Sequence, residues 1–136
     1  MNYLLDTNVC IALLNNNRET VRTHFEDAVA SGSTIYASTI VAFELWYGAW
    51  NSERQARNKL RIEAFFVANV QSLPFDERDA QEAGELRNEL RALGKPIGPY
   101  DLMIAAQARA RNLALVSHNV REFGRVAGLK VRDWEV

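Results

Sequence analysis

Three acidic residues stand where the surrounding sequence gives a carboxylate no obvious structural purpose. Asp6 directly follows the apolar run Tyr3-Leu4-Leu5, Glu44 lies within an apolar and aromatic stretch, and Asp101 opens an apolar segment. A carboxylate is costly to bury in such surroundings unless it is paired, protonated or bound to a cation. Converging carboxylates repel one another, and Mg²⁺ or Mn²⁺ would offset that repulsion while taking their oxygens as ligands. Such an ion can hold a phosphate group and activate water, so the pattern indicates metal-assisted hydrolysis.

Each candidate also has a structural interpretation. Asp6 and Asp101 could cap the helices that follow them, because carboxylates in a first helical turn accept hydrogen bonds from free amides. Asn119 follows another apolar run, at residues 113–116, and could equally be a cap or turn residue. Glu44 could lie at an exposed seam or pair with an arginine. The location of the residues in the fold therefore decides between structure and chemistry.

Apolar runs and helical periodicity predict the elements that carry these residues. The apolar runs predict strands at residues 3–5, 34–37, 70–73, 113–116 and, more weakly, 129–131. Helical patterns cover residues 8–14, 20–30, 40–49, 52–67, 76–93 and 100–111. Ser52-Glu53-Arg54-Gln55 has the form of a capping box and predicts where the fourth helix begins.

Strands that alternate with helices indicate an α/β sandwich with a mainly parallel sheet. Ligands bind beyond the carboxyl ends of the strands in such sheets. Asp6 and Asn119 each follow a strand and would therefore meet at one edge. Thr7 and Ser117 could orient the ligands there, while Asn119 supplies a neutral oxygen.

The composition places bounds on the function. The chain has 136 residues, 48% of them hydrophobic and 24% charged, which predicts a single domain over residues 1–136. A formal net charge of −1 excludes a polyanion binder that relies on bulk charge, but not a nucleic-acid enzyme with local basic patches. Cys10 is the only cysteine, so no internal disulfide can form. Without a membrane span or a signal peptide, the protein is expected to be cytoplasmic.

The stretches around the candidates resemble the PIN-domain ribonucleases, and among them the VapC-type toxins of bacterial type II toxin–antitoxin pairs. The matching stretches are Tyr3–Asn8, Phe43–Ala49, Pro96–Ala106, Val116–Asn119 and the tail Arg121–Leu129. They follow the family's order over essentially the whole chain. The resemblance implies a PIN-like α/β/α sandwich with a short, mainly parallel sheet flanked by helices.

The resemblance also implies an activity and partners. It marks Asp6, Glu44 and Asp101 as metal ligands for Mg²⁺, with Mn²⁺ as a possible substitute. Asn119 stands where many PIN proteins carry a further acid, which favours one resident ion over two. The implied activity is endoribonucleolytic hydrolysis of structured RNA, such as transfer or ribosomal RNA, leaving a 5′-phosphate. The implied partners are a second copy of the chain and an inhibitory VapB-like antitoxin, which together form a higher complex.

RNA would be held by basic side chains near the acidic edge. The candidates are Arg121 and Arg125, followed by Arg87, Arg91 and Lys95, and solvated helix faces or antitoxin contacts are the alternative. Trp46 and Tyr47 could stack on a base, although core or dimer packing is favoured. No histidine is required: His118 is expected in a loop and Cys10 in the core.

Two other functions remain open. A phosphatase also carries an aspartate after its first strand, but it usually has a second aspartate two positions on, where Asn8 stands. It would also need a lysine near the acidic edge, where only Lys95 is available. The other alternative is a PIN-like module that binds RNA or protein without cleavage. The acidic set argues against it, because these carboxylates would repel phosphate groups.

Overall fold

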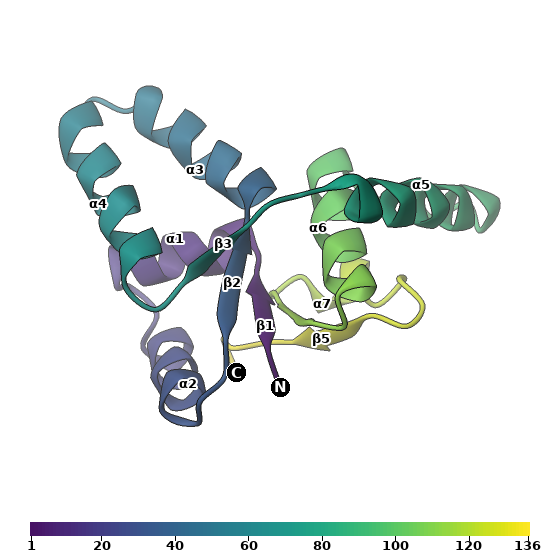
Figure 1. The fold of residues 1–136 in the computed structure, drawn as a ribbon, viewed down its shortest axis with the longest axis horizontal. Helices are drawn as coiled ribbons and strands as arrows, with labels where there is room; N and C mark the ends of the chain where they lie inside the picture. The colour runs from purple at the N-terminus through teal and green to yellow at the C-terminus, as the bar shows by residue number, and fades with distance from the viewer.

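The computed structural model describes residues 1–136 and is built around a five-stranded sheet (Figure 1). All four strand pairings are parallel, so every carboxyl end faces the same edge. The strands, in sheet order, are β3 (Gln71–Leu73), β2 (Ile35–Ser38), β1 (Tyr3–Leu5), β4 (Ala114–Val116) and β5 (Lys130–Arg132). The first strand of the chain is therefore the central strand of the sheet.

Seven helices connect and flank the strands, because parallel neighbours need a crossover connection. They are α1 (Thr7–Asn15), α2 (Glu19–Ala30), α3 (Thr39–Trp50), α4 (Gln55–Val67), α5 (Glu77–Ala92), α6 (Pro99–Ala110) and α7 (Val120–Phe123). In Figure 1, α3 and α4 lie together on one side, and α5 and α6 lie together on the other. None of these helices combines the length and apolar character needed to span a bilayer. The predicted α/β sandwich with a parallel sheet is confirmed.

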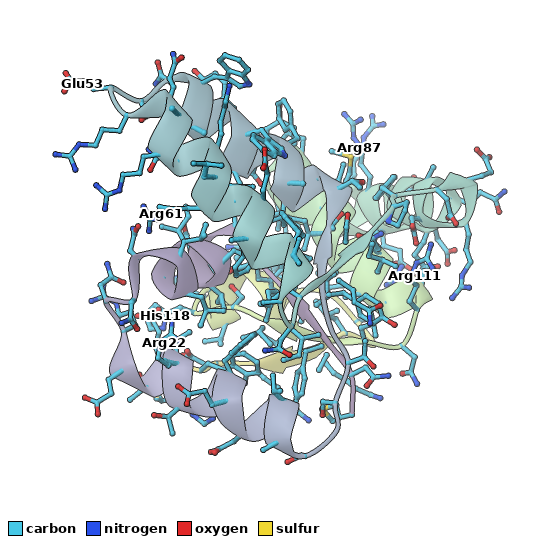
Figure 2. The ribbon with its side chains drawn as sticks, turned by 60° about the vertical axis from the view of Figure 1, so that its left-hand side comes forward. Arg22, Glu53, Arg61, Arg87, Arg111 and His118 are labelled. Atoms are coloured by element: carbon cyan, nitrogen blue, oxygen red, sulfur yellow. The ribbon has the colours of Figure 1, made fainter.

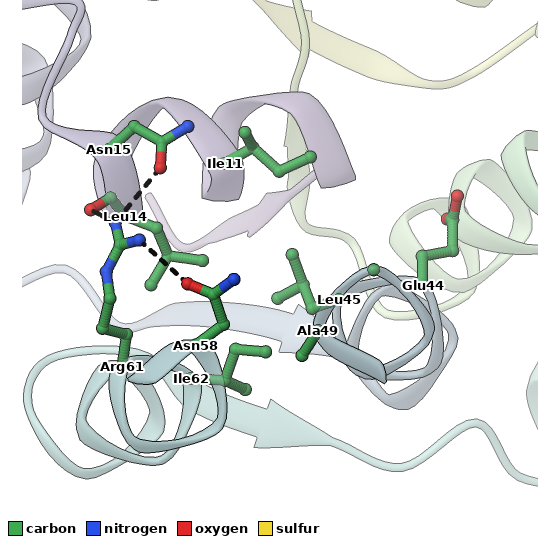
Figure 3. A pocket seen from close by; sticks show the side chains of 10 residues that line it. Ile11, Leu14, Asn15, Glu44, Leu45, Ala49, Asn58, Arg61 and Ile62 are labelled. Carbon is green, nitrogen blue, oxygen red and sulfur yellow. Dashed lines mark hydrogen bonds between the residues drawn. The ribbon is translucent and has the colours of Figure 1, made fainter. Parts of the chain in front are cut away.

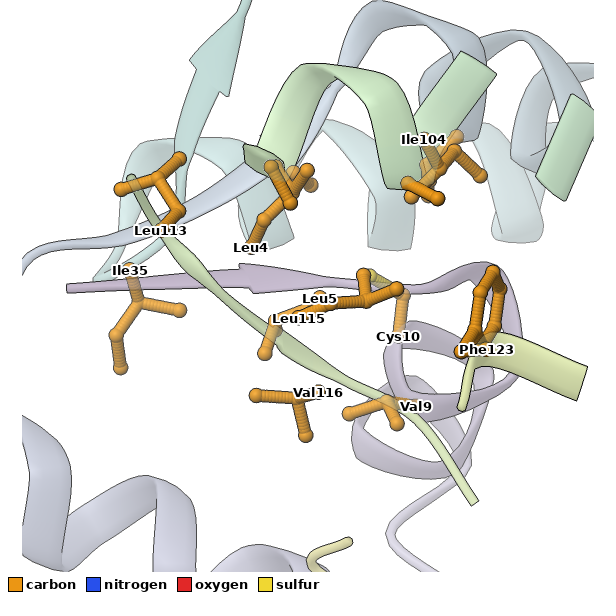
Figure 4. Packing of buried hydrophobic residues seen from close by; sticks show 14 of the residues in the cluster. Leu4, Leu5, Val9, Cys10, Ile35, Ile104, Leu113, Leu115, Val116 and Phe123 are labelled. Atoms are coloured by element: carbon orange, nitrogen blue, oxygen red, sulfur yellow. The ribbon is translucent and has the colours of Figure 1, made fainter. Parts of the chain in front are cut away.

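The core forms on both faces of the central strands. Leu4 and Leu5 of β1 are fully buried, and they point to opposite faces because side chains alternate along a strand. Figure 4 shows Ile104 of α6 on one side of β1 and β4, and Val9 of α1 on the other. Cys10 is a fully buried core residue, as predicted, and burial raises the pKa of its thiol well above the usual value. A rigid core therefore lies directly beneath the carboxyl ends of β1 and β4.

The predicted capping box at residues 52–55 is wrong. Residues 51–54 form the turn between α3 and α4, and α4 begins only at Gln55. The hydroxyl oxygen of Ser52 accepts hydrogen bonds within this region, from the backbone amide of Arg54 at 2.9 Å and from Asn58 Nδ2 at 2.8 Å. Arg54 occupies the N-cap position without a side-chain cap. The Ser52 hydroxyl therefore stabilises the turn between α3 and α4. It does not accept the backbone hydrogen bond that a capping box requires.

A buried ion pair joins the start of α5 to the end of α6. Asp79 is fully buried, and its two carboxylate oxygens accept hydrogen bonds from Nε and Nη2 of Arg111, each at 3.0 Å. Gln107 Nε2 donates to the same carboxylate at 3.2 Å, and the backbone amide of Asp76 donates at 3.0 Å in a true capping box. This network anchors the C-terminal end of α6, the helix whose first turn carries Asp101.

We predict that Arg111→Ala lowers the free energy of unfolding by about 3 kcal/mol, because it leaves the buried Asp79 carboxylate without its cationic partner. Urea denaturation followed by circular dichroism measures the loss. The matched control is Arg57→Ala, since Arg57 is exposed and forms no ion pair. Equal losses in the two variants would contradict a stabilising role for the Arg111–Asp79 pair.

Candidate functional site

Asp6 lies at the carboxyl end of the central strand. Its carboxylate caps α1 by accepting a hydrogen bond from the backbone amide of Val9 at 2.9 Å. Burial raises its pKa, and the charges of Glu44 and Glu135 add to the increase, although hydrogen bonds from Ser117 and Val9 oppose it. Asp6 is therefore both a helix cap and a carboxylate whose charge is only partly compensated.

Glu44 is held by a residue from a different element. Thr7 Oγ1, in the first turn of α1, donates a hydrogen bond to Glu44 Oε1 at 2.7 Å. Glu44 is half-buried and forms no ion pair. The alternative interpretation of Glu44 as the partner of an arginine is therefore wrong. Thr7 thus lies where an orienting residue was expected.

Asp101 does not cap its helix. Gly98 is the N-cap of α6, and no backbone amide donates to the Asp101 side chain. Burial raises the pKa of Asp101 to about 6, with further contributions from the negative charges of Glu122, Asp6 and Glu44. The negative charges that contribute to this increase belong to residues 6, 44 and 122, which are far apart in sequence and lie near Asp101 in the fold.

Glu122 is the member of this group that the sequence analysis missed. It lies in α7, and its carboxylate oxygen Oε2 accepts a hydrogen bond from Asn119 Nδ2 at 2.8 Å. Asn119 makes no side-chain cap, and its backbone amide donates to Ser117 Oγ at 3.0 Å. The available signal was the three-residue spacing of Asn119 and Glu122, which places both side chains on one helix face.

Ser117 connects two parts of the site. It is fully buried directly after β4, its hydroxyl hydrogen-bonds with the Asp6 carboxylate, and its oxygen accepts the Asn119 amide. A cleft of about 560 Å³ opens beside this point, and both Asp6 and Asn119 line it. Ser117 therefore fixes the relative position of the β1 and β4 ends at the wall of the cleft.

The four carboxylates suit a divalent cation. Asp6, Glu44, Asp101 and Glu122 form no salt bridge with any lysine, arginine or histidine. Burial is the main cause of the raised pKa values of Asp6 and Asp101, and the neighbouring negative charges add to it without a cation to oppose them. A hard cation with oxygen ligands would supply it, so the donor set fits Mg²⁺ or Mn²⁺.

The candidate RNA-binding arginines lie close to this edge in the chain but differ in their contacts. Arg121, in α7, is exposed, whereas Arg125 Nη1 donates to the carbonyl oxygen of Pro96 at 3.3 Å. Arg87 and Arg91 line a separate cavity of about 550 Å³ between α5 and the start of α6. Arg87, Arg91, Lys95 and Arg121 are all exposed, and Arg125 alone of the candidates donates a side-chain hydrogen bond.

A groove runs between α1, α3 and α4 and reaches Glu44 (Figure 3). Ile11, Leu45 and Ile62 form its apolar lining. At its other end, the Arg61 guanidinium donates to the carbonyl oxygen of Leu14 and to Asn15 Oδ1. The groove has a volume of about 250 Å³, and Glu44 is the one member of the acidic cluster that lines it.

Comparison with known proteins agrees with this geometry. The family model described as PIN domain matches residues 3–129. The tRNA(fMet)-specific endonuclease VapC of Shigella flexneri is 40% identical over 134 residues, covering 98% of each chain. Ribonuclease VapC2 of Rickettsia felis is 35% identical over 135 residues, covering 99% of each chain.

Two solved structures share the fold. The crystal structure of VapBC2 from Rickettsia felis, bound to a promoter DNA fragment, matches with a TM-score of 0.91 at 34% identity, covering 98% of this chain and 99% of that chain. The DNA-bound VapBC structure from Salmonella typhimurium matches with a TM-score of 0.89 at 37% identity, covering 98% of both chains. With its parallel sheet, its acidic edge and these full-length similarities, the chain belongs to the PIN domain family, among the VapC-type proteins.

Proposed function

We propose that this protein is a metal-dependent endoribonuclease and the toxin of a type II toxin–antitoxin pair. The observation that carries the proposal is the convergence of Asp6, Glu44, Asp101 and Glu122 without a basic partner. Similarity to VapC ribonucleases over nearly the full chain supports the same conclusion. We expect the protein to act in the cytoplasm, because its proposed RNA substrate is found there.

The side chains have distinct tasks in this proposal. Asp6, Glu44 and Asp101 hold the Mg²⁺ ion, for which Mn²⁺ can substitute. Bound there, the ion supplies positive charge to the scissile phosphate and lowers the pKa of water. Thr7 and Ser117 hold Glu44 and Asp6 by hydrogen bonds, so that these carboxylates need little rearrangement to bind.

Asn119 adds a further constraint. Its amide nitrogen donates to Glu122, which leaves the amide oxygen free and directs the glutamate carboxylate. In this arrangement Glu122 of α7 supplies the carboxylate that many PIN proteins carry at the position of Asn119. One ion or two can be accommodated by such a set, and one is the simpler occupant because Asn119 carries no charge.

The substrate proposed is structured RNA, with transfer or ribosomal RNA favoured. The Shigella flexneri relative carries the name of a tRNA(fMet)-specific endonuclease, which supports the first of these. Arg121 is exposed in α7, one position from Glu122, and is suited to hold a phosphate of the RNA backbone. Hydrolysis leaves a 5′-phosphate and a free 3′-hydroxyl.

The proposed regulator is a VapB-like antitoxin, acting on a homodimer of this chain. Relatives from Rickettsia felis and Salmonella typhimurium were crystallised as VapBC complexes, which supports such a partner. The groove that ends at Glu44 offers an apolar path by which an antitoxin segment could reach the acidic cluster (Figure 3). Binding there would block RNA access directly.

RNA cleavage should depend on the acidic cluster. We expect Asp6→Asn and Asp101→Asn each to reduce the cleavage rate at least about 10²-fold, because each removes charge that holds the ion. Cleavage of transfer RNA with Mg²⁺ or with EDTA is followed on denaturing gels. Asp27→Asn is the matched control, since Asp27 is exposed in α2. RNA bound but uncut by the Mg²⁺-loaded protein would support a binding module, and hydrolysis of phosphomonoesters alone would support a phosphatase.

The raised pKa of Asp101 also predicts a pH-dependent stability. Its pKa of about 6 in the folded protein lies above the ordinary aspartate value of 3.8, so the carboxylate destabilises the metal-free fold above pH 6. This penalty disappears as the pH falls below 4. Because Asp101 is partly exposed and solvent screens the repulsion, Asp101→Asn should add only about 1 kcal/mol at pH 7.5, or about 3 °C in Tm.

Thermal unfolding in EDTA at pH 7.5 and at pH 4 measures this effect. The gain from Asp101→Asn should shrink at the lower pH, and Mg²⁺ should raise the Tm of the wild type more than that of the variant. Asp27→Asn, which changes an exposed carboxylate, should leave Tm unchanged at both values. A destabilised Asp101→Asn variant at pH 7.5 would show that Asp101 serves the fold.

Toxin activity predicts an effect in the cell. We expect induced expression to arrest bacterial growth, and co-expression of the cognate antitoxin to restore it. Growth curves of cells expressing the wild type or Asp101→Asn, with matched protein levels on immunoblots, measure this. Normal growth with abundant folded wild-type protein and no antitoxin would contradict the assignment.

A further inference from the structure

Outside the four-carboxylate cluster, a histidine and two carboxylates gather at the ends of β4 and β5. Val116 pairs with Arg132 in the parallel register, so the residues just beyond these strands lie at the same edge. His118 Nδ1 lies 3.1 Å from Asp133 Oδ2 and 3.3 Å from Glu135 Oε2. One ligand atom from each of the three residues lies within 4.8 Å of the others.

The C-terminal segment that carries both carboxylates is firmly anchored. Trp134, between them, is buried and packs edge-to-face on Tyr3 with ring centroids 5.3 Å apart. The backbone amide of Glu135 donates to Asp133 Oδ1 at 2.9 Å, which turns Glu135 back toward the histidine. The Asp133 and Glu135 side chains are only 15% and 29% exposed. The carboxylates are thus held in place before any ligand binds.

We propose that His118, Asp133 and Glu135 form a second metal site, which binds a divalent transition-metal ion such as Zn²⁺. Zinc binds histidine nitrogen and carboxylate oxygen at about 2.0–2.2 Å, so tetrahedral geometry separates its ligand atoms by about 3.3–3.6 Å. The observed separations of 3.1 and 3.3 Å from the histidine nitrogen need little adjustment to reach that range. His118 is 64% exposed, which leaves its side open for an ion to enter.

The ligand types separate this site from the four-carboxylate cluster. Mg²⁺ prefers oxygen ligands throughout, whereas an imidazole nitrogen suits Zn²⁺ and its transition-metal neighbours. The two sites share no ligand, yet the cleft of about 560 Å³ is lined by Asp6 and Asn119 as well as by His118 and Glu135. An ion bound to His118 at the second site would hold in place the neighbouring residues Ser117 and Asn119, which belong to the first site. The proposal does not depend on RNA cleavage.

Arg18 provides a test of whether the cluster is only an ion-pair network. Its Nε lies 3.2 Å from Glu135 Oε1, so this glutamate presents Oε2 to the histidine and Oε1 to the arginine. If the cluster were only a network of ion pairs, removing Arg18 would not change the affinity of the protein for Zn²⁺. If it binds metal, the arginine charge opposes the incoming cation, and its removal strengthens binding.

Isothermal titration calorimetry with Zn²⁺ in excess Mg²⁺ tests the proposal. The titrations use the Asp6→Asn/Asp101→Asn protein, in which the four-carboxylate cluster has lost two acids. We expect one equivalent to bind, with affinity at least about tenfold weaker once His118→Gln or Asp133→Asn is added. Asp133→Asn keeps an oxygen that can accept the Glu135 amide, so the turn persists.

The controls separate this site from the other histidine. His24→Gln, which can still donate to the carbonyl oxygen of Val136, should leave Zn²⁺ binding unchanged. Arg18→Gln should tighten it several-fold. Circular dichroism establishes that each variant is folded, and Co²⁺ absorption reports the coordination geometry independently. Absence of Zn²⁺ binding, or binding unaffected by His118→Gln and Asp133→Asn, would overturn the proposal.

Discussion

Mutual repulsion of like charges is the constraint on which this structure depends. Four carboxylates from different elements converge at the carboxyl edge of a parallel sheet, and burial raises the pKa of Asp101 to about 6. The fold holds them there by neutral hydrogen bonds, from Thr7 to Glu44 and from the Val9 amide to Asp6, without any basic partner. A site made this way keeps its negative potential available for a cation, at the expense of some stability.

Interactions far from the site offset this loss of stability. The Asp79–Arg111 pair lies where α5 meets the end of α6, and Figure 2 shows Arg111 and His118 on opposite sides of the molecule. The central strand is buried on both faces. Rigid packing beneath the acidic edge therefore resists the separation of the carboxylates, and stabilising interactions elsewhere leave the edge free for chemistry.

Local patterns were sufficient to predict the sheet and the residues that follow its strands. Asp6 and Asn119 were found because parallel strands end at one edge, and Glu44 because its neighbours are apolar. Glu122 escaped because a charged residue on a short helix resembles any solvated one. Asp79 could not be identified either, since its burial depends on Arg111, which is 32 residues away. Sequence patterns report local periodicity, whereas these two residues are defined by contacts across the fold.

The distribution of the acidic cluster along the chain has a consequence for the cell that makes this protein. Its members extend from residue 6 to residue 122, and Glu122 follows β4, which pairs with the central strand β1. A growing polypeptide on the ribosome therefore lacks the assembled centre until β4 and Glu122 have been made.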